Sequence, residues 1–142
     1  MRAARVATLA TVGADGAPLA TLVAVTDDGR GRPLFLLSGL AKHTKNLRAN
    51  PSASVLVSGE HSASMDRPRV TLSGRVEWLE GDEAEAAKQR FTQTHEEAKT
   101  WVTLADFKPA RLVPTSIRFV GGFSRAAAIS PADYEHEPPL PS

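Results

Sequence analysis

Cysteine is absent from this chain of 142 residues. Disulfide bonds, thiolate nucleophiles and zinc or iron–sulfur sites built on cysteine are therefore excluded. Long apolar runs are absent as well, because nowhere do about 18 apolar residues follow one another, as a membrane helix requires. The segment that follows Met1 has no apolar stretch long enough for a signal peptide. We therefore expect a cytoplasmic protein.

A large excess of charge of either sign is also lacking. The sequence has 17 lysine and arginine residues against 16 aspartate and glutamate residues, which gives a formal net charge of +1. Nucleic acids and anionic membranes usually bind proteins with a strong basic excess, so we expect neither as a partner. The length is that of one domain. We assign residues 1–130 to that domain and residues 131–142, rich in proline and acidic side chains, to a loose tail.

Six segments have the composition of β-strands. Residues 69–78 alternate most clearly, with Val70, Leu72 and Val76 on one face. In residues 18–26 and 33–38 both faces are about equally apolar, which indicates strands that are covered on both sides. The strands are predicted at residues 5–12, 18–26, 33–38, 52–58, 69–78 and 110–121, with helices at 40–49 and 82–106, the second broken near His95.

Short turns join most of these strands, and Asp15-Gly16 is typical of a tight hairpin. Strands joined in this way pair antiparallel, and a sheet that closes on itself has no exposed edges. The predicted fold class is therefore mainly β with some α: a six-stranded, mostly antiparallel β-barrel with flanking helices.

The first predicted helix begins with cations. Its first turns contain Lys42, His43 and Lys45 and no acidic residue, although a helix N-terminus already carries partial positive charge. A bound anion would remove this conflict, because backbone N–H groups, these side chains and the hydroxyls of Ser38 and Thr44 could hold a phosphate. A solvated basic helix face is the alternative, and both interpretations remain open.

Few other residues offer chemistry of their own. Arg69 opens its strand on the polar face, where it could reach a ligand or remain an exposed arginine. Arg125 follows the paired glycines Gly121-Gly122, which indicate the exit from the last strand. The four histidines are scattered, and no spacing among them indicates a metal site, so no metal is predicted. A protein with few plausible nucleophiles is expected to use an organic cofactor.

Four stretches resemble the pyridoxamine-phosphate-oxidase-like FMN-binding split barrels and, within that superfamily, the haem-utilisation (HugZ-type) branch. They are Thr8–Thr21, Ser38–Leu47 running into Asn50-Pro51, Arg69–Gly74 and Arg118–Ala126. The split-barrel fold of that family has its strands and helices in the order predicted above.

The resemblance implies a homodimer with two FMN molecules in the clefts between its subunits. One strand would run beside the flavin ring, a basic pair would hold the phosphate, and one arginine would come from the partner subunit. Together with the hydroxyls at the helix start, the candidate cofactor-binding residues are Thr21, Leu22, Val23, Ala24, Ser38, Lys42, His43, Thr44, Arg69 and Arg125.

These observations favour an FMN-dependent oxidoreductase of unknown substrate, with no catalytic residue identified. A flavin-binding module without turnover fits the same residues, because split-barrel flavin sites need no dedicated acid or base. A deazaflavin could occupy the same cleft. A haem-binding or haem-degrading protein is the alternative of another class, and in that case His43 or His95 would ligate the iron.

Overall fold

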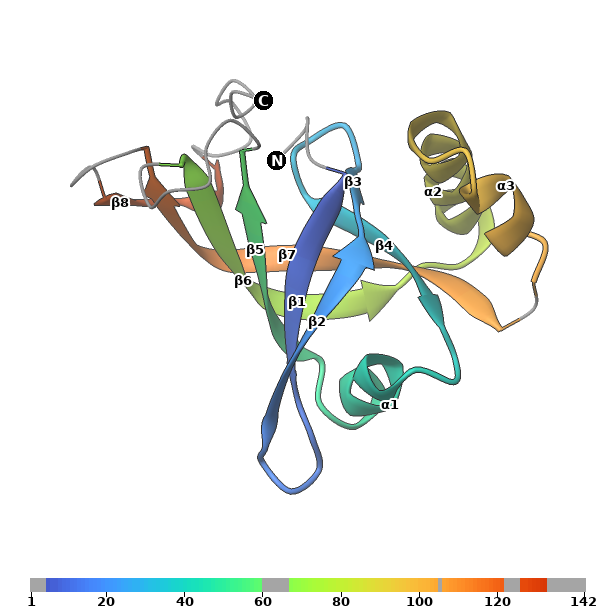
Figure 1. Ribbon diagram of the computed structural model, residues 1–142, viewed down its shortest axis with the longest axis horizontal. Helices are drawn as coiled ribbons and strands as arrows, with labels where there is room; N and C mark the ends of the chain where they lie inside the picture. Colours follow the sequence, from blue (N-terminus) through green and yellow to red (C-terminus); the bar gives the residue numbers. More distant parts are fainter. Residues whose placement is uncertain (1–4, 60–66, 105, 122–125, 133–142) are drawn as a thin grey trace.

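The computed structural model describes residues 5–59, 67–104, 106–121 and 126–132 (Figure 1). In these ranges the strands form one eight-stranded sheet that curls into a barrel, and helices lie against it. The elements are β1 (Val6–Val12), β2 (Pro18–Ala24), β3 (Thr26–Asp27), β4 (Pro33–Ser38), α1 (Lys42–Ala49), β5 (Ser52–Ser58), β6 (Arg69–Trp78), α2 (Gly81–Thr94), α3 (Ala98–Trp101), β7 (Phe107–Val120) and β8 (Ala126–Ile129).

The two edges of the sheet are joined by a direct connection between β2 and β3. Its strand order is β2-β1-β5-β6-β7-β4-β3, with β8 paired to β7. Every pairing between these strands is antiparallel. β2 and β3 stand at opposite ends of this order, yet only Val25 separates them in sequence. The chain therefore passes directly from one edge of the sheet to the other, and the sheet wraps round on itself as a split barrel.

Alternate residues of the strands fill the interior of the barrel. Leu9, Val55, Leu72 and Leu112 are completely buried and come from β1, β5, β6 and β7, while Phe35 of β4 is buried among them. Side chains alternate across a strand, so the residues between these point outward. Burial of each such side chain contributes about 1.5–3 kcal/mol, which makes the interior the main source of stability.

β4 is buried on both faces, as its composition predicts. Phe35 and Leu37 belong to the barrel interior, whereas Leu34 and Leu36 belong to a second core beneath α2 and α3, where Phe91 is completely buried. This second core holds the two helices against the outside of the barrel (Figure 1).

β2 differs from its prediction. Val23 is buried, but Leu22 is 73% exposed. The prediction that residues 18–26 are covered on both sides is therefore wrong for a single chain. No element in the described part of the chain packs over Leu22 on the outward face.

The mainly-β split-barrel fold and its six principal strands are confirmed. The short strands β3 and β8 are additional. α3 ends at Trp101 and β7 begins at Phe107, although the sequence predicts helix to residue 106 and strand only from residue 110. Pro109 and Pro114 lie inside β7, and proline weakens a strand prediction because it cannot donate to the ladder.

None of the helices in the described ranges is both long and apolar enough to cross a membrane. The domain boundary at residue 130 stays a prediction, since residues 133–142 of the tail lie outside the described residues.

Candidate functional site

The cationic start of α1 follows directly from the end of β4. Three residues (39–41) make the connection, and the N–H of Gly39 donates to the carbonyl of Asp106 at 2.7 Å. Ala41 is the N-cap of α1, no described side chain caps the helix, and its first turn contains no acidic residue. The helix start is therefore uncapped, and its first turn lacks acidic residues, as the sequence predicts.

Ser38 shapes this connection. Its Oγ donates to Asp106 Oδ2 at 3.0 Å and accepts from the N–H of Leu40 at 3.2 Å. The hydroxyl thus ties the entry of α1 to the start of β7, and its role in binding a cofactor stays a prediction.

His43 links α1 to the edge of the barrel. Its Nδ1 lies 3.1 Å from Oγ1 of Thr21 in β2, and the same Oγ1 lies 3.5 Å from the carbonyl oxygen of Leu9 in β1. Partial burial lowers the pKa of His43 below its ordinary value, so the neutral imidazole is favoured near neutral pH. Two of the predicted site residues are therefore in direct contact.

The neighbours of His43 have opposite environments. Lys42 is exposed. Thr44 is completely buried, and its Oγ1 has no hydrogen-bond partner within the described part of the chain. The structure therefore places Lys42 and His43 at the surface and Thr44 beneath it.

The predicted residues of β2 divide between the two faces of the strand. Val23 lies in the barrel interior, and Ala24 packs against the second core. Leu22 points outward, next to Thr21. α1 packs mainly against β1, where Asn46 Nδ2 donates to Thr11 Oγ1, and His43 adds a contact with Thr21 of β2.

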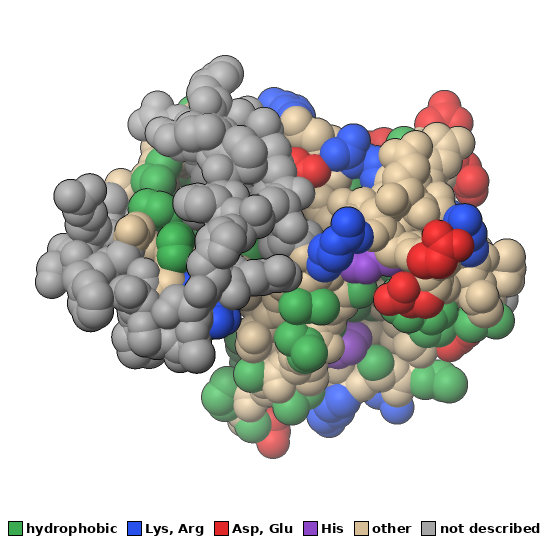
Figure 2. Space-filling view, turned by 45° about the horizontal axis from the view of Figure 1, so that its top comes forward, with side chains coloured by type: hydrophobic (Ala, Val, Ile, Leu, Met, Phe, Trp, Pro, Cys, Tyr) green, Lys and Arg blue, Asp and Glu red, His purple; other side chains and the backbone are tan. Residues whose placement is uncertain are grey.

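An apolar face, which we define as Val6, Leu22 and Leu56, covers the outside of β1, β2 and β5. These side chains are 53%, 73% and 42% exposed, and Thr8 pairs with both leucines. Figure 2 shows hydrophobic side chains beside histidine on one face of the molecule, with lysine and arginine nearby. No sequence pattern predicted the apolar face, although the alternation of residues 52–58 already places Leu56 opposite the buried valines.

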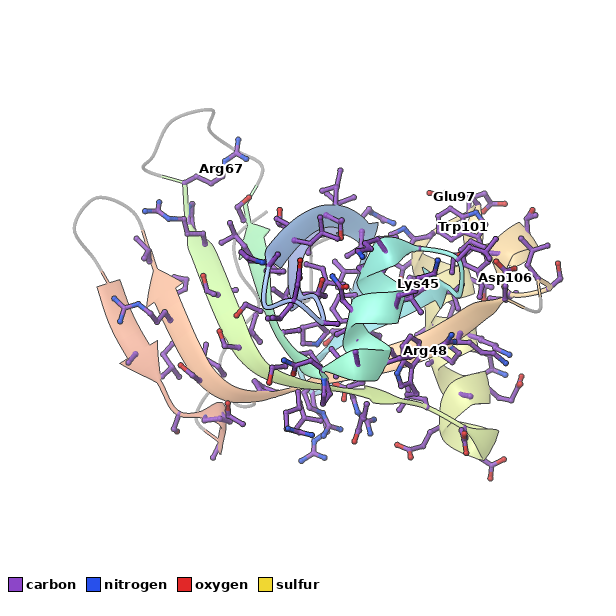
Figure 3. All side chains as sticks on the ribbon, turned by 90° about the horizontal axis from the view of Figure 1, so that it is seen from below. Lys45, Arg48, Arg67, Glu97, Trp101 and Asp106 are labelled. Atoms are coloured by element: carbon purple, nitrogen blue, oxygen red, sulfur yellow. The ribbon has the colours of Figure 1, made fainter. Side chains whose placement is uncertain are left out.

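Arg69 lies at the other end of the sheet. It pairs with Ser58 at the end of β5, whereas α1 precedes the start of β5. Figure 3 shows Arg67, two residues before Arg69, well away from α1, on which Lys45 is labelled. Within a single chain, Arg69 is therefore far from the start of α1. Arg125 lies outside the described residues.

His95 has a packing role. Its ring is 6% exposed and stacks on Phe91 with the ring centroids 5.3 Å apart, and its Nε2 lies 2.9 Å from the carbonyl oxygen of Val25. It holds the end of α2 against the link between β2 and β3. The other two histidines, His61 and His136, lie outside the described residues.

Within the described ranges, no three histidine, aspartate or glutamate side chains gather in a way that could hold a metal ion. The site at α1 offers a single imidazole, a cation and apolar surface. Such a set is suited to a ligand that is itself largely apolar and carries a negative charge.

Comparison with known proteins identifies the family. A family model described as "CREG, beta-barrel" matches residues 1–136, so the chain belongs to this family. It is 32% identical over 114 residues to the non-canonical chloroplastic haem oxygenase HOZ of Arabidopsis thaliana. The aligned region covers 79% of this chain and 34% of HOZ. It is also 30% identical over 132 residues to the haem oxygenase HutZ of Vibrio cholerae, and that alignment covers 88% of this chain and 74% of HutZ.

Among solved structures, a haem-binding protein from Mycobacterium smegmatis superposes with a TM-score of 0.88 at 33% identity. The match covers 93% of this chain and 55% of that one. The chain thus spans about a third of HOZ and about half of the M. smegmatis chain.

These relatives correct the cofactor prediction. They are named for haem and not for flavin, so the predictions of FMN as cofactor and of an FMN-dependent oxidoreductase are wrong. The resemblance to the haem-utilisation branch of the split barrels is confirmed. The error has a physical source: a cationic helix start suits a carboxylate as well as a phosphate, and one fold can hold unrelated ligands.

Proposed function

We propose that this chain binds haem. Haem is a flat ring that is apolar over most of its surface and carries two carboxylates and a central iron. One observation carries the proposal: an exposed leucine lies next to the cationic start of α1. Leu40 is 79% exposed and comes three residues before His43, which contacts Thr21 of β2.

The described residues offer contacts to the porphyrin ring and to its propionates. Removing apolar surface from water stabilises a complex by about 25 cal/mol per Å², and Leu40 offers such surface to the porphyrin. Lys42 and the positive end of α1 favour a propionate carboxylate. The names of HOZ, HutZ and the M. smegmatis protein support the same ligand.

Degradation of the bound haem is a second candidate function, favoured by the description of HOZ and HutZ as haem oxygenases. Such a reaction requires dioxygen and an electron donor from outside the chain. The part of the chain would be to bind the substrate and to fix its orientation.

Titration of the purified chain with hemin tests the proposal. We expect a shifted Soret band that saturates at one haem for each chain. Leu40→Glu should weaken binding, because a carboxylate would replace apolar surface beside the propionate. Ala86→Glu on the exposed side of α2 is the matched control and should bind as the unaltered chain does.

Absence of a Soret shift in the unaltered chain would refute haem binding. Ascorbate added in air to the haem complex then separates the two candidate functions. Loss of the Soret band with release of iron indicates degradation, and a stable band indicates binding without turnover.

We also propose that two copies of the chain associate through the apolar face. A contiguous apolar surface that is exposed to water marks an interface, and an isologous dimer is the commonest way to cover it. Arg69 is on the same outward side, because it lies two residues from Thr71, which pairs with Leu56. In such a dimer Arg69 of one chain would approach the α1 start of the other.

A further inference from the structure

Two histidines lie in the described ranges, and their ring nitrogens are used differently. The Nε2 of His95 is held by the carbonyl of Val25, and its ring is almost completely buried. His43 makes its contact through Nδ1, and its Nε2 has no partner among the described residues. Of these two rings, His43 is therefore the one with a nitrogen open to a ligand.

The hydrogen bonds of Thr21 determine where the proton of His43 lies. The Thr21 hydroxyl donates its single proton toward the carbonyl of Leu9. When that proton points to Leu9, the Thr21 oxygen accepts a hydrogen bond from His43 Nδ1, which then carries the imidazole proton. A neutral imidazole protonated at Nδ1 has its lone pair on Nε2, which is the arrangement of a metal-binding histidine. The lowered pKa of His43 keeps the ring neutral.

The position of His43 at the start of α1 also suits an iron ligand. His43 is the second residue of α1 and contacts Thr21 of β2, and Leu40, three residues before it, is exposed. A haem that packs on Leu40 would lie beside the imidazole.

We infer that His43 binds the haem iron through Nε2 and that Thr21 is a positioning residue that holds the imidazole for this contact. The inference rests on the proposed haem binding and adds the identity of the iron ligand.

Hemin spectra of the full chain and of variants test the ligand. His43→Ala should lose the histidine-ligated spectrum, and added imidazole should restore it. Lys99→Ala, at an exposed lysine of α3 outside the site, is the control and should keep both spectrum and affinity. Circular dichroism of each variant checks that the barrel has folded.

A positive signature is available because the chain has no cysteine of its own. His43→Cys should give the absorbance and electron paramagnetic resonance of a thiolate-ligated ferric haem, which could arise only from position 43. Thr21→Val should keep the histidine spectrum but weaken haem affinity about 10- to 100-fold, the usual effect of losing the partner of a ligating histidine.

The inference is overturned if His43→Ala keeps the spectrum of the unaltered chain, or if His61→Ala or His136→Ala abolishes that spectrum instead. In those cases haem binding itself stands. If the unaltered chain binds no haem, the proposed function fails and the ligand assignment fails with it.

Discussion

Two buried threonines, Thr11 beside α1 and Thr44 within it, show how much depends on single hydroxyl groups. Thr11 of β1 accepts a hydrogen bond from Asn46 Nδ2 at 3.1 Å, which joins the helix to the barrel. Thr44 is as deeply buried, but its hydroxyl has no partner in the described part of the chain. A buried polar group without a partner costs about 1–3 kcal/mol.

Thr44→Val should therefore raise the free energy of unfolding by about 1 kcal/mol, because it removes an unsatisfied hydroxyl while keeping the volume. Thr11→Val is the matched comparison. It should lower the free energy of unfolding by about 1–2 kcal/mol, since the amide of Asn46 loses its acceptor. Urea titration followed by circular dichroism measures both. Equal losses in the two variants would contradict the contrast between the hydroxyls.

At this scale the sequence predicted only part of the candidate site. The charges of Lys42 and His43 follow from their neighbours in sequence, so the positive helix start could be recognised. The bond between His43 and Thr21 joins residues 22 apart and depends on how α1 sits against β2. No local pattern contains that information. The exposure of Leu22 was missed for the same reason, because composition does not tell which apolar face is covered.

Among the elements, α2 is held to the barrel by a charged contact as well as by its apolar side. Asp27 of β3 is buried, and Arg90 of α2 donates from Nη2 to Oδ1 of Asp27 at 2.8 Å and from Nε to the Asp27 carbonyl at 2.5 Å. Removing the arginine takes away the counter-charge of a buried carboxylate and leaves it with neutral donors such as the N–H of Gly31, 3.2 Å from Oδ2.

Arg90→Ala should lower the free energy of unfolding by about 2 kcal/mol, in the range measured for hydrogen bonds to charged groups. Lys88→Ala is the control on the same helix. Lys88 lies 3.7 Å from the exposed Glu85, and a surface pair of this kind contributes at most about 0.5 kcal/mol. Chemical denaturation of both variants gives the comparison, and an equally small loss from Arg90→Ala would show that the pair does not anchor the helix.

The strand and helix predictions succeeded where the pattern is local and long. β6 alternates over ten residues, and the structure has it at the predicted bounds. β3 has two residues and β8 has four, which is too short for an alternation to be recognised. In β7 the proline at position 109 lies in the first part of the strand, which the sequence did not predict.

At the scale of the whole molecule, the split barrel presents one face that the chain does not cover. Val6, Leu22 and Leu56 lie on adjacent strands, so their exposed surfaces form one patch. The fold could be predicted because local patterns in the sequence indicate each main strand and helix and the order in which they follow one another. The ligand could not, because the same barrel accepts chemically different ring systems and the sequence specifies only a positive helix start beside it.

Leu22→Glu should convert the proposed dimer to a monomer, because a carboxylate would be buried at the centre of the apolar face. Light scattering coupled to size-exclusion chromatography should find twice the mass of one chain for the unaltered protein and the mass of one chain for the variant. Leu104→Glu, at another exposed leucine outside this face, should leave the mass unchanged. A monomeric unaltered protein would refute the association.

β4 is the common wall of two packed layers, with Phe35 and Leu37 on the barrel side and Leu34 and Leu36 on the helix side. If either core loses its packing, β4 is exposed on that side, and the other core then packs against a less ordered strand. We therefore expect the barrel and the two helices to unfold as one cooperative unit. Trp78, packed against the barrel layer, and Trp101, packed against the helix layer, give two built-in fluorescent reporters of that single event.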